Sequence, residues 1–380
     1  MRILYVAMRY DYGDRSAGGS FEHWNFFHPL SQMGFDLLYF DFLTIMQRRG
    51  QQEMNRRLWE VARSERPDLM FVVLFQDQLD KGVVRRISEE LETVTINWFC
   101  DDHWRFDNFS RFWAPCFNWV VTTARSAVAK YERIGYANVI KSQWAANHFQ
   151  YRRLELPLMY DVTFVGRPHG DRREVIAELR RAGIDVRVWG EGWKQGRIEQ
   201  EEMVKVFNQS RINLNLSQAS SAGDSPPPSA LGRRLATLPC PGPIRRLGKR
   251  VLGRIGVLSR LSGVADGSLR PEQIKGRNFE VPGCGGFLLS GLADDLDRYY
   301  CIGEEIVCFD SLSDLIERTR YYLAHEQQRQ AIAKAGYRRT IAQHTWAHRF
   351  DEIFRSTGLE SPPLEELIRG RSGGQVIEVG

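Results

Sequence analysis

A charged stretch followed by glycines holds the residues best suited to chemistry. Residues 277–290 read RNFEVPGCGGFLLS, a pattern that predicts a helix, a tight turn and a buried strand. A carboxylate at Glu280 can accept two hydroxyl hydrogen bonds, as from a ribose, while nearby cations and backbone amides hold phosphates. Gly285 lies in the turn, where the absence of a side chain lets a ligand approach the backbone. A helix–turn–strand of any α/β protein is the alternative, and this segment alone leaves both open.

Charged residues upstream extend this pattern. Glu272 precedes Glu280 by eight positions, which gives E-x7-E, and Lys275 and Arg277 stand between them. Glu272 lies at the edge of a stretch of different composition. Solvated surface charges are the alternative for all three upstream residues.

Other glycine-rich and polar segments follow predicted strands. They are Gly18, Gly19 and Ser20; Asp101, Asp102 and His103; Gly166 and Arg167; and Gly190, Glu191 and Gly192. Ligands of doubly wound sheets bind at the carboxyl ends of strands, so these segments are candidates for one common site. The first segment lacks both G-x-G-x-x-G and G-x-x-x-x-G-K-S/T, so its glycines alone are weak evidence for phosphate binding.

Strand-like and helix-like stretches alternate along the chain. Apolar runs at 3–7, 36–42, 68–75, 94–99 and 119–123 predict strands, with helices at 21–33, 51–63, 79–91 and 126–134 between them. The pattern breaks near Pro157 and restarts, with strands at 160–165, 185–189, 212–216, 287–290 and 306–309. Such alternation predicts a parallel sheet with helices on both faces, here twice. The predicted fold class is therefore α/β, with two Rossmann-like doubly wound domains facing each other across a cleft.

The same pattern sets the predicted domain boundaries. The first domain covers 1–156, the second covers 157–340, and a last helix occupies 341–358. Residues 217–271 contain three consecutive prolines and read as an insertion in the second domain, partly disordered. The tail 359–380, which contains Pro-Pro and Gly-Gly pairs, is predicted to be loose.

Composition places the chain among globular proteins. Hydrophobic residues make up 43% and charged residues 26%, and no run of 18 apolar residues predicts a spanning helix. The first apolar stretch ends by Arg9, which is too short for a signal peptide and reads as a first strand. Six cysteines show neither C-x-x-C nor a zinc-like spacing to histidine, so structural zinc and a disulfide framework are not expected. A reducing cytoplasm fits best.

The net charge of +5 is unevenly distributed. Residues 225–265 contain eight Arg or Lys and no Asp or Glu, so the rest of the chain sums to −3. The basic character belongs to this one segment, and a nucleic-acid-binding body is not expected. Apolar residues recur at steps of three and four from Ile244 to Leu258, which predicts a basic amphipathic helix. Such a helix can lie on an anionic membrane surface; a disordered, solvated loop is the alternative.

Six motifs, in this order and spacing, resemble the CgeB-like branch of GT-B glycosyltransferases, named for a spore-maturation protein. They are WFCDD at 98–102, DVTFVGR at 161–167, VWGEGW at 188–193, VFNQSRINLN at 206–215, QIKGRNFE at 273–280 and HTWAHR at 344–349. The region 217–271 departs from that group, which usually has a shorter loop there. The resemblance implies sugar transfer from a nucleotide donor without a folded metal site. It also implies a donor on the second domain, an acceptor on the first, and a helix near 342–355 that crosses back.

The resemblance further implies roles for individual residues. Glu280 matches the ribose-binding carboxylate, while Lys275 and Arg277 would neutralise a diphosphate leaving group, which gains negative charge in the transition state. The remaining donor-binding candidates are Arg167 and Arg172 at the phosphates, Gly190 and Gly192 beside the nucleobase, and Gly285 and Glu272. An exposed first-turn cation is the alternative for Arg172.

Candidates for the acceptor side come from the first domain. GT-B enzymes commonly place a loop such as 18–20 near the transferred sugar. Asp102, Asp101 and His23 are the candidate bases, because an acceptor hydroxyl must lose its proton if configuration inverts. If configuration is retained, the donor phosphate can take that proton itself. Strand-end charges in a solvated loop are the alternative.

The sequence therefore predicts a metal-independent glycosyltransferase in the cytoplasm, with a nucleotide-sugar as substrate and no cofactor. Its expected partners are the donor, a glycan, lipid-linked or protein acceptor, and an anionic membrane surface reached through 225–265; nucleic acid is not among them. One rival is a nucleotide-sugar epimerase of the same fold. Another is a non-catalytic GT-B-like module that binds glycans or a protein. The sequence identifies neither the sugar, the nucleotide, the acceptor, the stereochemistry nor the oligomeric state.

Overall fold

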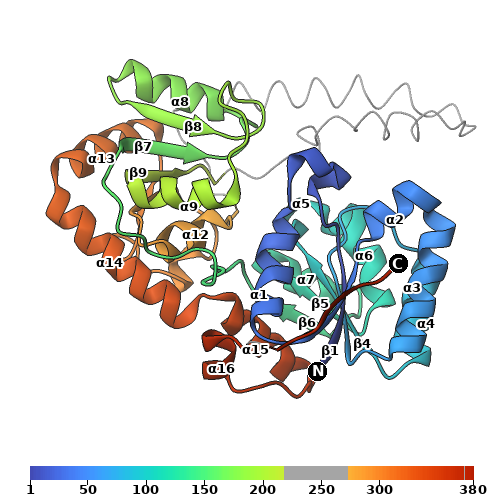
Figure 1. Ribbon diagram of the computed structural model, residues 1–380. Coiled ribbons are helices and arrows are strands. Elements are labelled where there is room, and N and C mark those ends of the chain that lie inside the picture. The colour runs from blue at the N-terminus through green and yellow to red at the C-terminus, as the bar shows by residue number, and fades with distance from the viewer. Residues whose placement is uncertain (218–272, 372) are drawn as a thin grey trace, which may run out of the picture.

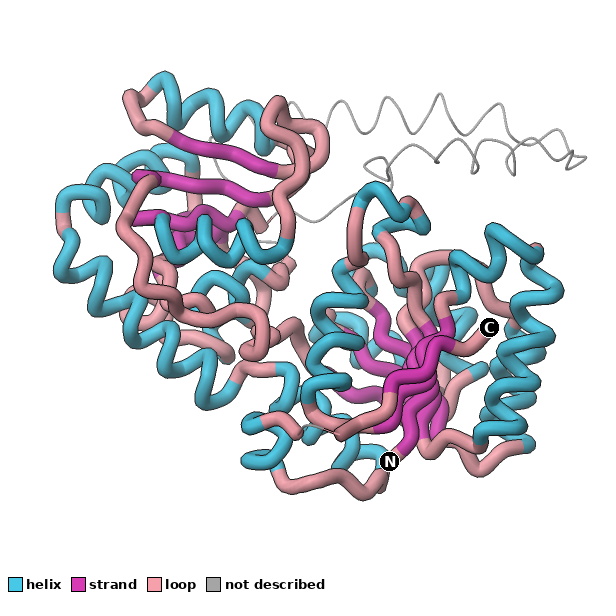
Figure 2. Tube along the Cα trace, in the orientation of Figure 1, coloured by secondary structure: helices cyan, strands magenta, loops and turns pink. Residues whose placement is uncertain are grey.

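Two parallel sheets with flanking helices make up the protein, one in each domain (Figures 1 and 2). The computed structural model describes residues 1–217, 273–371 and 373–380. The first sheet has seven strands in the order β12-β2-β1-β3-β4-β5-β6, and the second has five in the order β11-β10-β9-β7-β8. The predicted fold class, α/β with two doubly wound domains, is confirmed.

The first sheet is built from short apolar strands that are buried on both faces. Its strands are β1 (Arg2–Val6), β2 (Asp36–Phe40), β3 (Leu69–Val72), β4 (Val94–Phe99), β5 (Trp119–Thr122), β6 (Val139–Lys141) and, from the C-terminal tail, the exposed strand β12 (Val376–Glu378). Between them lie η3 (His23–Phe27), α1 (His28–Gln32), α2 (Phe42–Arg49), α3 (Gln51–Glu65), α4 (Lys81–Glu90), α5 (Asp102–Arg105), α6 (Arg111–Trp113) and α7 (Arg125–Arg133). Helices α2 and α4 each start at an aspartate, Asp41 and Asp80, whose side chain accepts a hydrogen bond from a first-turn amide.

The second sheet repeats the plan with the same parallel pairing. Its strands are β7 (Tyr160–Val165), β8 (Val186–Trp189), β9 (Ser210–Asn215), β10 (Leu288–Gly291) and β11 (Val307–Phe309). Its helices are α8 (Arg172–Arg181), α9 (Gln200–Gln209), α12 (Arg277–Gly283), α13 (Leu312–Ala324) and α14 (Glu326–Gln343). One apolar cluster runs without interruption from Phe26 and Trp98 of the first domain to Phe279 and Leu288 of the second. The two domains therefore share part of one core.

The chain returns to the first domain after α14. Helix α15 (Trp346–Thr357) begins at Thr345, which forms a capping box with His348. The ring of Trp346 packs 4.6 Å from Phe26 and 5.4 Å from Trp98, so the helix is anchored in the first-domain core. This is the crossing helix that the resemblance places near 342–355.

The prediction that the tail is loose is wrong for its described residues. It forms α16 (Leu364–Arg369) and a strand, β12 (Val376–Glu378), which pairs in parallel with β2. In Figure 1 the red C-terminal segment runs back across the blue first domain. Backbone groups of β12 pair with the edge of the sheet at β2, which is otherwise open, while the side chains of β12 stay exposed. Within the described residues, no helix is long and apolar enough to cross a membrane.

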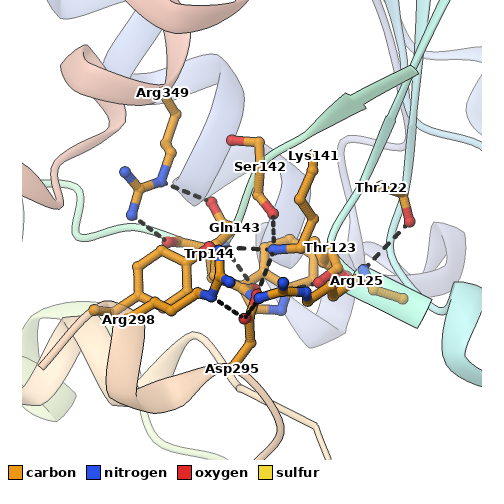
Figure 3. Close-up of polar contacts among 12 residues, drawn as sticks. Thr122, Thr123, Arg125, Lys141, Ser142, Gln143, Trp144, Asp295, Arg298 and Arg349 are labelled. Atoms are coloured by element: carbon orange, nitrogen blue, oxygen red, sulfur yellow. Dashed lines mark hydrogen bonds and ion pairs between the residues drawn. The ribbon is translucent and has the colours of Figure 1, made fainter. Parts of the chain in front are cut away.

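A buried guanidinium joins the two segments, near 143–144 and 343–345, through which the chain crosses between the domains; we call this place the crossing point. Arg349 of α15 is 7% exposed and donates from Nε to the carbonyl of Gln143 at 3.0 Å. Its Nη groups donate to the carbonyls of Trp144 at 3.4 Å and Gln343 at 3.3 Å. Figure 3 shows Arg349 above the 143–144 segment. One side chain thus ties together both segments through which the chain passes between domains.

We expect Arg349→Met to lower the free energy of unfolding by about 2–4 kcal/mol, because two buried carbonyls and one partly buried carbonyl lose a charged donor. Arg355→Met is the matched control, since Arg355 lies on the same helix with a side chain that is 72% exposed. That control should change stability by less than about 0.5 kcal/mol. Urea unfolding measures both, and equal effects of the two substitutions would contradict the assignment.

Candidate functional site

Loops from the carboxyl ends of both sheets meet at an interdomain junction. Asp11 follows β1 and lies 3.3 Å from Arg167, which follows β7; Arg197 also pairs with Asp11. Gln273 leads into α12 and donates to the carbonyl of Cys100, after β4, at 3.0 Å. Arg277 also donates to the carbonyl of Val165, so the segments 98–102, 161–167 and 273–280 are brought together.

Glu280 is fully enclosed at the second-domain side of this junction. Its side chain is 0% exposed and accepts a hydrogen bond from the Tyr151 hydroxyl at 3.0 Å, while Arg277 pairs with its other oxygen. Arg277 also donates to the carbonyl of Val165 at 3.3 Å. Burial raises the pKa of Tyr151 to about 12, so the phenol stays protonated as a donor. Ribose binding at Glu280 stays a prediction and requires Arg277 to release one carboxylate oxygen.

A buried amide–hydroxyl network fixes the start of α12. Asn215 of β9 donates to Asn278 and to Ser290 of β10, both at 3.0 Å. Asn278 in turn accepts from the backbone amide of Lys275 at 2.9 Å. This network positions the loop that carries Lys275 and Arg277. Sequence analysis missed its role, although both asparagines lie inside the quoted motifs.

Arg172 braces loops instead of presenting a surface cation. It is 6% exposed, and its Nη1 and Nη2 donate to the carbonyls of Arg167 at 3.0 Å and Leu216 at 2.5 Å. The exposed first-turn alternative is therefore wrong. The side chain of Lys275 donates to Gln273 at 3.1 Å, which keeps it at the junction. Glu272 and the predicted insertion, apart from Ser217, lie outside the described residues.

The predicted nucleobase loop needs its glycines for backbone reasons. Gly190 has φ +140°, and a Cβ there would lie 2.3 Å from the carbonyl oxygen of Gly166. Gly192 and Gly285 also have positive φ values, +92° and +73°. Trp193 donates from its indole to the same Gly166 carbonyl at 2.8 Å, so the ring is fastened to the β7 loop.

The three candidate bases lie in three different environments. Asp101 is partly exposed at the junction, 3.5 Å from Gln273. Asp102 is 1% exposed and accepts a hydrogen bond from the Tyr131 hydroxyl at 2.8 Å within the first domain. His23 stacks against Tyr39 on the side of β2, and burial lowers its pKa to about 4. Of the three, only Asp101 forms a hydrogen bond to the second domain among the described residues.

The glycine loop after β1 is held in a fixed shape. Ser20 donates to the carbonyl of Met8 at 2.7 Å and accepts from the amide of His23 at 3.0 Å, so it caps the following helix. Gly19 pairs with Tyr10 across the loop, and Gly18 has φ +77° with open space where a side chain would stand. Ser20 is buried, whereas Gly18 and Gly19 are partly exposed.

Glu22 is the functional candidate that the sequence did not single out. Burial is the main reason why the pKa of its carboxyl is raised to about 7, and the negative charges of Asp11 and Asp101 act in the same direction. Its Oε2 is buried and has no hydrogen-bond partner among the described residues. A carboxyl that titrates near neutral pH can exchange protons in catalysis. Its position after Gly-Gly-Ser was the available signal, but burial cannot be read from it.

Within the described residues, no group of three or more His, Cys, Asp or Glu is arranged to hold a metal ion. The acidic residues at the junction instead face arginines of the second domain, as Asp11 does.

Comparison with known protein families supports the predicted resemblance. A family model described as glycosyl transferase-like matches residues 168–229 and 254–355. Spore protein CgeB of Bacillus subtilis strain 168 is 22% identical over 252 residues, which are 62% of this chain and 65% of that protein. The chain therefore matches just under two thirds of the length of this relative. Both findings support a relation to CgeB-like GT-B glycosyltransferases.

Solved structures share the fold over nearly the whole chain. A sucrose-phosphate synthase from Thermosynechococcus elongatus has a TM-score of 0.59 at 10% identity and covers 94% of this chain and 99% of its own. Anabaena HepE in complex with UDP and glucose has a TM-score of 0.57 at 10% identity, with the same coverage. A glycosyltransferase from Rickettsia africae ESF-5 reaches 0.56 at 7% identity, covering 95% and 99%. At these identities the likeness shows the GT-B fold.

The buried Asp102 predicts a measurable pH dependence. Burial raises its pKa from 3.8 to about 6, so folding takes up a proton between these values and stability falls as pH rises through them. Asp102→Asn removes this dependence. From pH 4 to pH 7 we expect the wild type to lose on the order of 2 kcal/mol relative to the variant in denaturant unfolding. Asp107→Asn, an exposed neighbour, should show no such change, and a constant difference for Asp102→Asn would contradict the assignment.

Proposed function

We propose that this protein is a nucleotide-sugar-dependent glycosyltransferase. One observation supports this proposal most strongly. The match to the glycosyl transferase-like family lies mainly on the second domain, and loops of that domain contact the first domain through Arg167 and Gln273. The GT-B fold supports the same reading. A UDP-sugar is the first donor to test, because the HepE structure of this fold was solved with UDP and glucose.

The proposed reaction moves a glycosyl group between two oxygens. The acceptor hydroxyl oxygen bonds to the anomeric carbon, and the bond from that carbon to the diphosphate oxygen breaks. The electron pair leaves with the nucleoside diphosphate, and the hydroxyl proton passes to a base. No metal or redox group takes part in this proposal.

Second-domain residues receive the donor in this proposal. Glu280 binds the ribose hydroxyls once Arg277 turns from the carboxylate to the diphosphate, where its charge stabilises the leaving group. Arg167 is half-exposed, and exposed ion pairs contribute little stability, so a phosphate can displace Asp11 from it. Arg172 stays in place because its bonds hold the surrounding loops.

We assign the base to Glu22 and not to Asp102. Glu22 lies on the first-domain side of the junction, where burial, aided by the negative charges of Asp11 and Asp101, raises the pKa of its carboxyl to about 7. Its neighbour Phe21 packs against Gly276, where a Cβ would lie 3.1 Å from the phenyl ring. The segment that carries Glu22 is therefore in contact with the loop that leads into α12, and the charges that act on its carboxyl, Asp11 and Asp101, lie at the same junction. Asp102 faces its own domain, which supports a structural role.

The donor site predicts nucleotide binding that depends on Glu280. A ligand that binds only the native state raises the melting temperature, so UDP, GDP, dTDP, ADP and CDP are screened by thermal shift. We expect a rise with one of them and its loss in Glu280→Gln, which keeps the acceptor for Tyr151 but removes the charge. Glu317→Gln, an exposed carboxyl on α13, is the control and should keep the full shift. No shift with any nucleotide would favour the non-catalytic module instead.

The base assignment predicts a specific pH profile. Release of UDP from UDP-glucose to water is measured from pH 5 to 9, and the rate should rise through about pH 7 as Glu22 loses its proton. Glu22→Gln should lower the rate by about 10²–10⁴-fold. Asp101→Asn removes a negative neighbour, lowers the pKa of Glu22 and should shift the rise to lower pH. Activity kept in Glu22→Gln but lost in Asp101→Asn would make Asp101 the base.

A further inference from the structure

A polar cavity lies in the first domain, beside the carboxyl ends of β1 and β2. Its volume is about 370 Å³, within the range of small-molecule sites. Its lining includes Arg9, Arg15, Arg48, Arg49, Tyr10 and Tyr39. These residues come from the loop after β1, from β2 and from the last turn of α2, so separate elements converge on it. None of these residues is among the donor-binding or catalytic candidates.

Positive charge is in excess in this cavity. Arg9 pairs with Glu378 of β12, and the only other carboxylate side chain in the described lining, Asp41, caps α2. No ion pair to Arg15, Arg48 or Arg49 is found among the described residues. Four guanidinium groups therefore line the cavity against two carboxylate side chains and the terminal carboxylate of Gly380, and the remaining positive charge suits an anionic ligand such as a phosphomonoester.

Two of these arginines lie over aromatic rings. The guanidinium of Arg15 lies 5.2 Å from the ring centre of Tyr10. That of Arg9 lies 5.7 Å from Tyr10 and 5.8 Å from Tyr39. Stacking restricts the long side chains and so lowers the entropy that they lose when an anion binds. Phosphate oxygens suit the planar, multiple donors of arginine.

One loop separates this cavity from the interdomain junction. The amide of Ser20 donates to the carbonyl of Arg9 at 2.8 Å, and Tyr10 pairs with Gly19. Asp11, the next residue, pairs with Arg167 and Arg197 of the second domain. A ligand held at Tyr10 thus lies one residue along the chain from a contact with the donor domain.

We propose that this cavity binds the phosphate group of a phosphorylated acceptor whose hydroxyl is presented at the interdomain junction. The inference rests on the proposed glycosyl transfer, and it adds the chemical class of the acceptor. The ligand is a phosphomonoester, carried either by a soluble sugar phosphate or by a lipid headgroup. Tyr10 and Tyr39 supply apolar faces for the carbon skeleton, and the arginines supply the charge.

The test compares glucose 6-phosphate with glucose by calorimetry in a buffer without phosphate. We expect glucose 6-phosphate, but not glucose, to bind the wild type, and Arg48→Gln with Arg49→Gln to weaken binding at least tenfold. The matched control is Arg63→Gln with Arg133→Gln. It removes two exposed arginines from the last turns of α3 and α7, as the test variant does from α2. Equal weakening in both double variants would overturn the site.

A second arm separates the two sources of the phosphate. Sedimentation with phosphatidylcholine vesicles containing phosphatidic acid is compared with sedimentation with pure phosphatidylcholine vesicles. Retention by phosphatidic acid that is lost only in the Arg48/Arg49 variant assigns the phosphate to a lipid, and binding of glucose 6-phosphate alone assigns it to a soluble acceptor. Failure of both probes to distinguish this variant from the control overturns the inference.

Nucleotide binding distinguishes a failure of the phosphomonoester site from a failure of the proposed glycosyl transfer. The thermal shift with UDP should be unchanged in the Arg48/Arg49 variant, because these residues lie away from the donor loops. A UDP shift without phosphomonoester binding would overturn this inference and leave the glycosyltransferase proposal standing. Phosphomonoester binding without any nucleotide shift would support the cavity and count against the donor site.

Discussion

The relative placement of the two sheets is the constraint on which the whole site depends, and buried polar contacts at the crossing point set it. Arg349 reaches carbonyls on both crossing segments, and a parallel bridge between Ala146 and Thr345 joins the same segments. Asp295 adds a second tie, because Lys141 and Arg125 of the first domain lie 3.3 Å and 3.1 Å from its carboxylate (Figure 3). Its side chain is only 8% exposed, so these charges are poorly screened.

Charges at the junction differ in how easily they can be exchanged for a ligand. Arg167 is half-exposed and shared between Asp11 and Glu191, so a phosphate can replace a carboxylate at little cost. Arg172 is buried on two carbonyls, and removing it would leave those acceptors unpaired. Two arginines five residues apart thus have separate tasks, one as an exchangeable cation and the other as a fixed brace.

The sequence predicts what local patterns determine and misses what distant contacts decide. Alternating apolar runs predict all strands of the second sheet and all of the first except β6 and β12, and the charged stretch before the glycines predicts α12 correctly. The tail strand was missed because Val376 pairs with Leu37 across more than 300 residues, and Pro-Pro and Gly-Gly pairs are local signals for loose chain. The contact of Glu280 with Tyr151 was missed for the same reason, since Tyr151 comes from the crossing segment.

Asp102 and Glu22 show why residue type and strand-end position do not suffice to identify a base. Both follow the carboxyl end of a strand, and burial raises the pKa of both. The groups that perturb Asp102 most after burial are hydroxyls of its own domain, at Ser110, Thr122 and Tyr131. Those that perturb Glu22 include carboxylates at the edge facing the second domain. Glu22 Oε2 and Asp102 Oδ1 are both buried without a hydrogen-bond partner among the described residues, so the two differ in position, and in our proposal only Glu22 can receive its missing donor from an acceptor hydroxyl. An unpaired buried oxygen costs about 1–3 kcal/mol, and substrate binding would recover part of that energy where the proton must be taken.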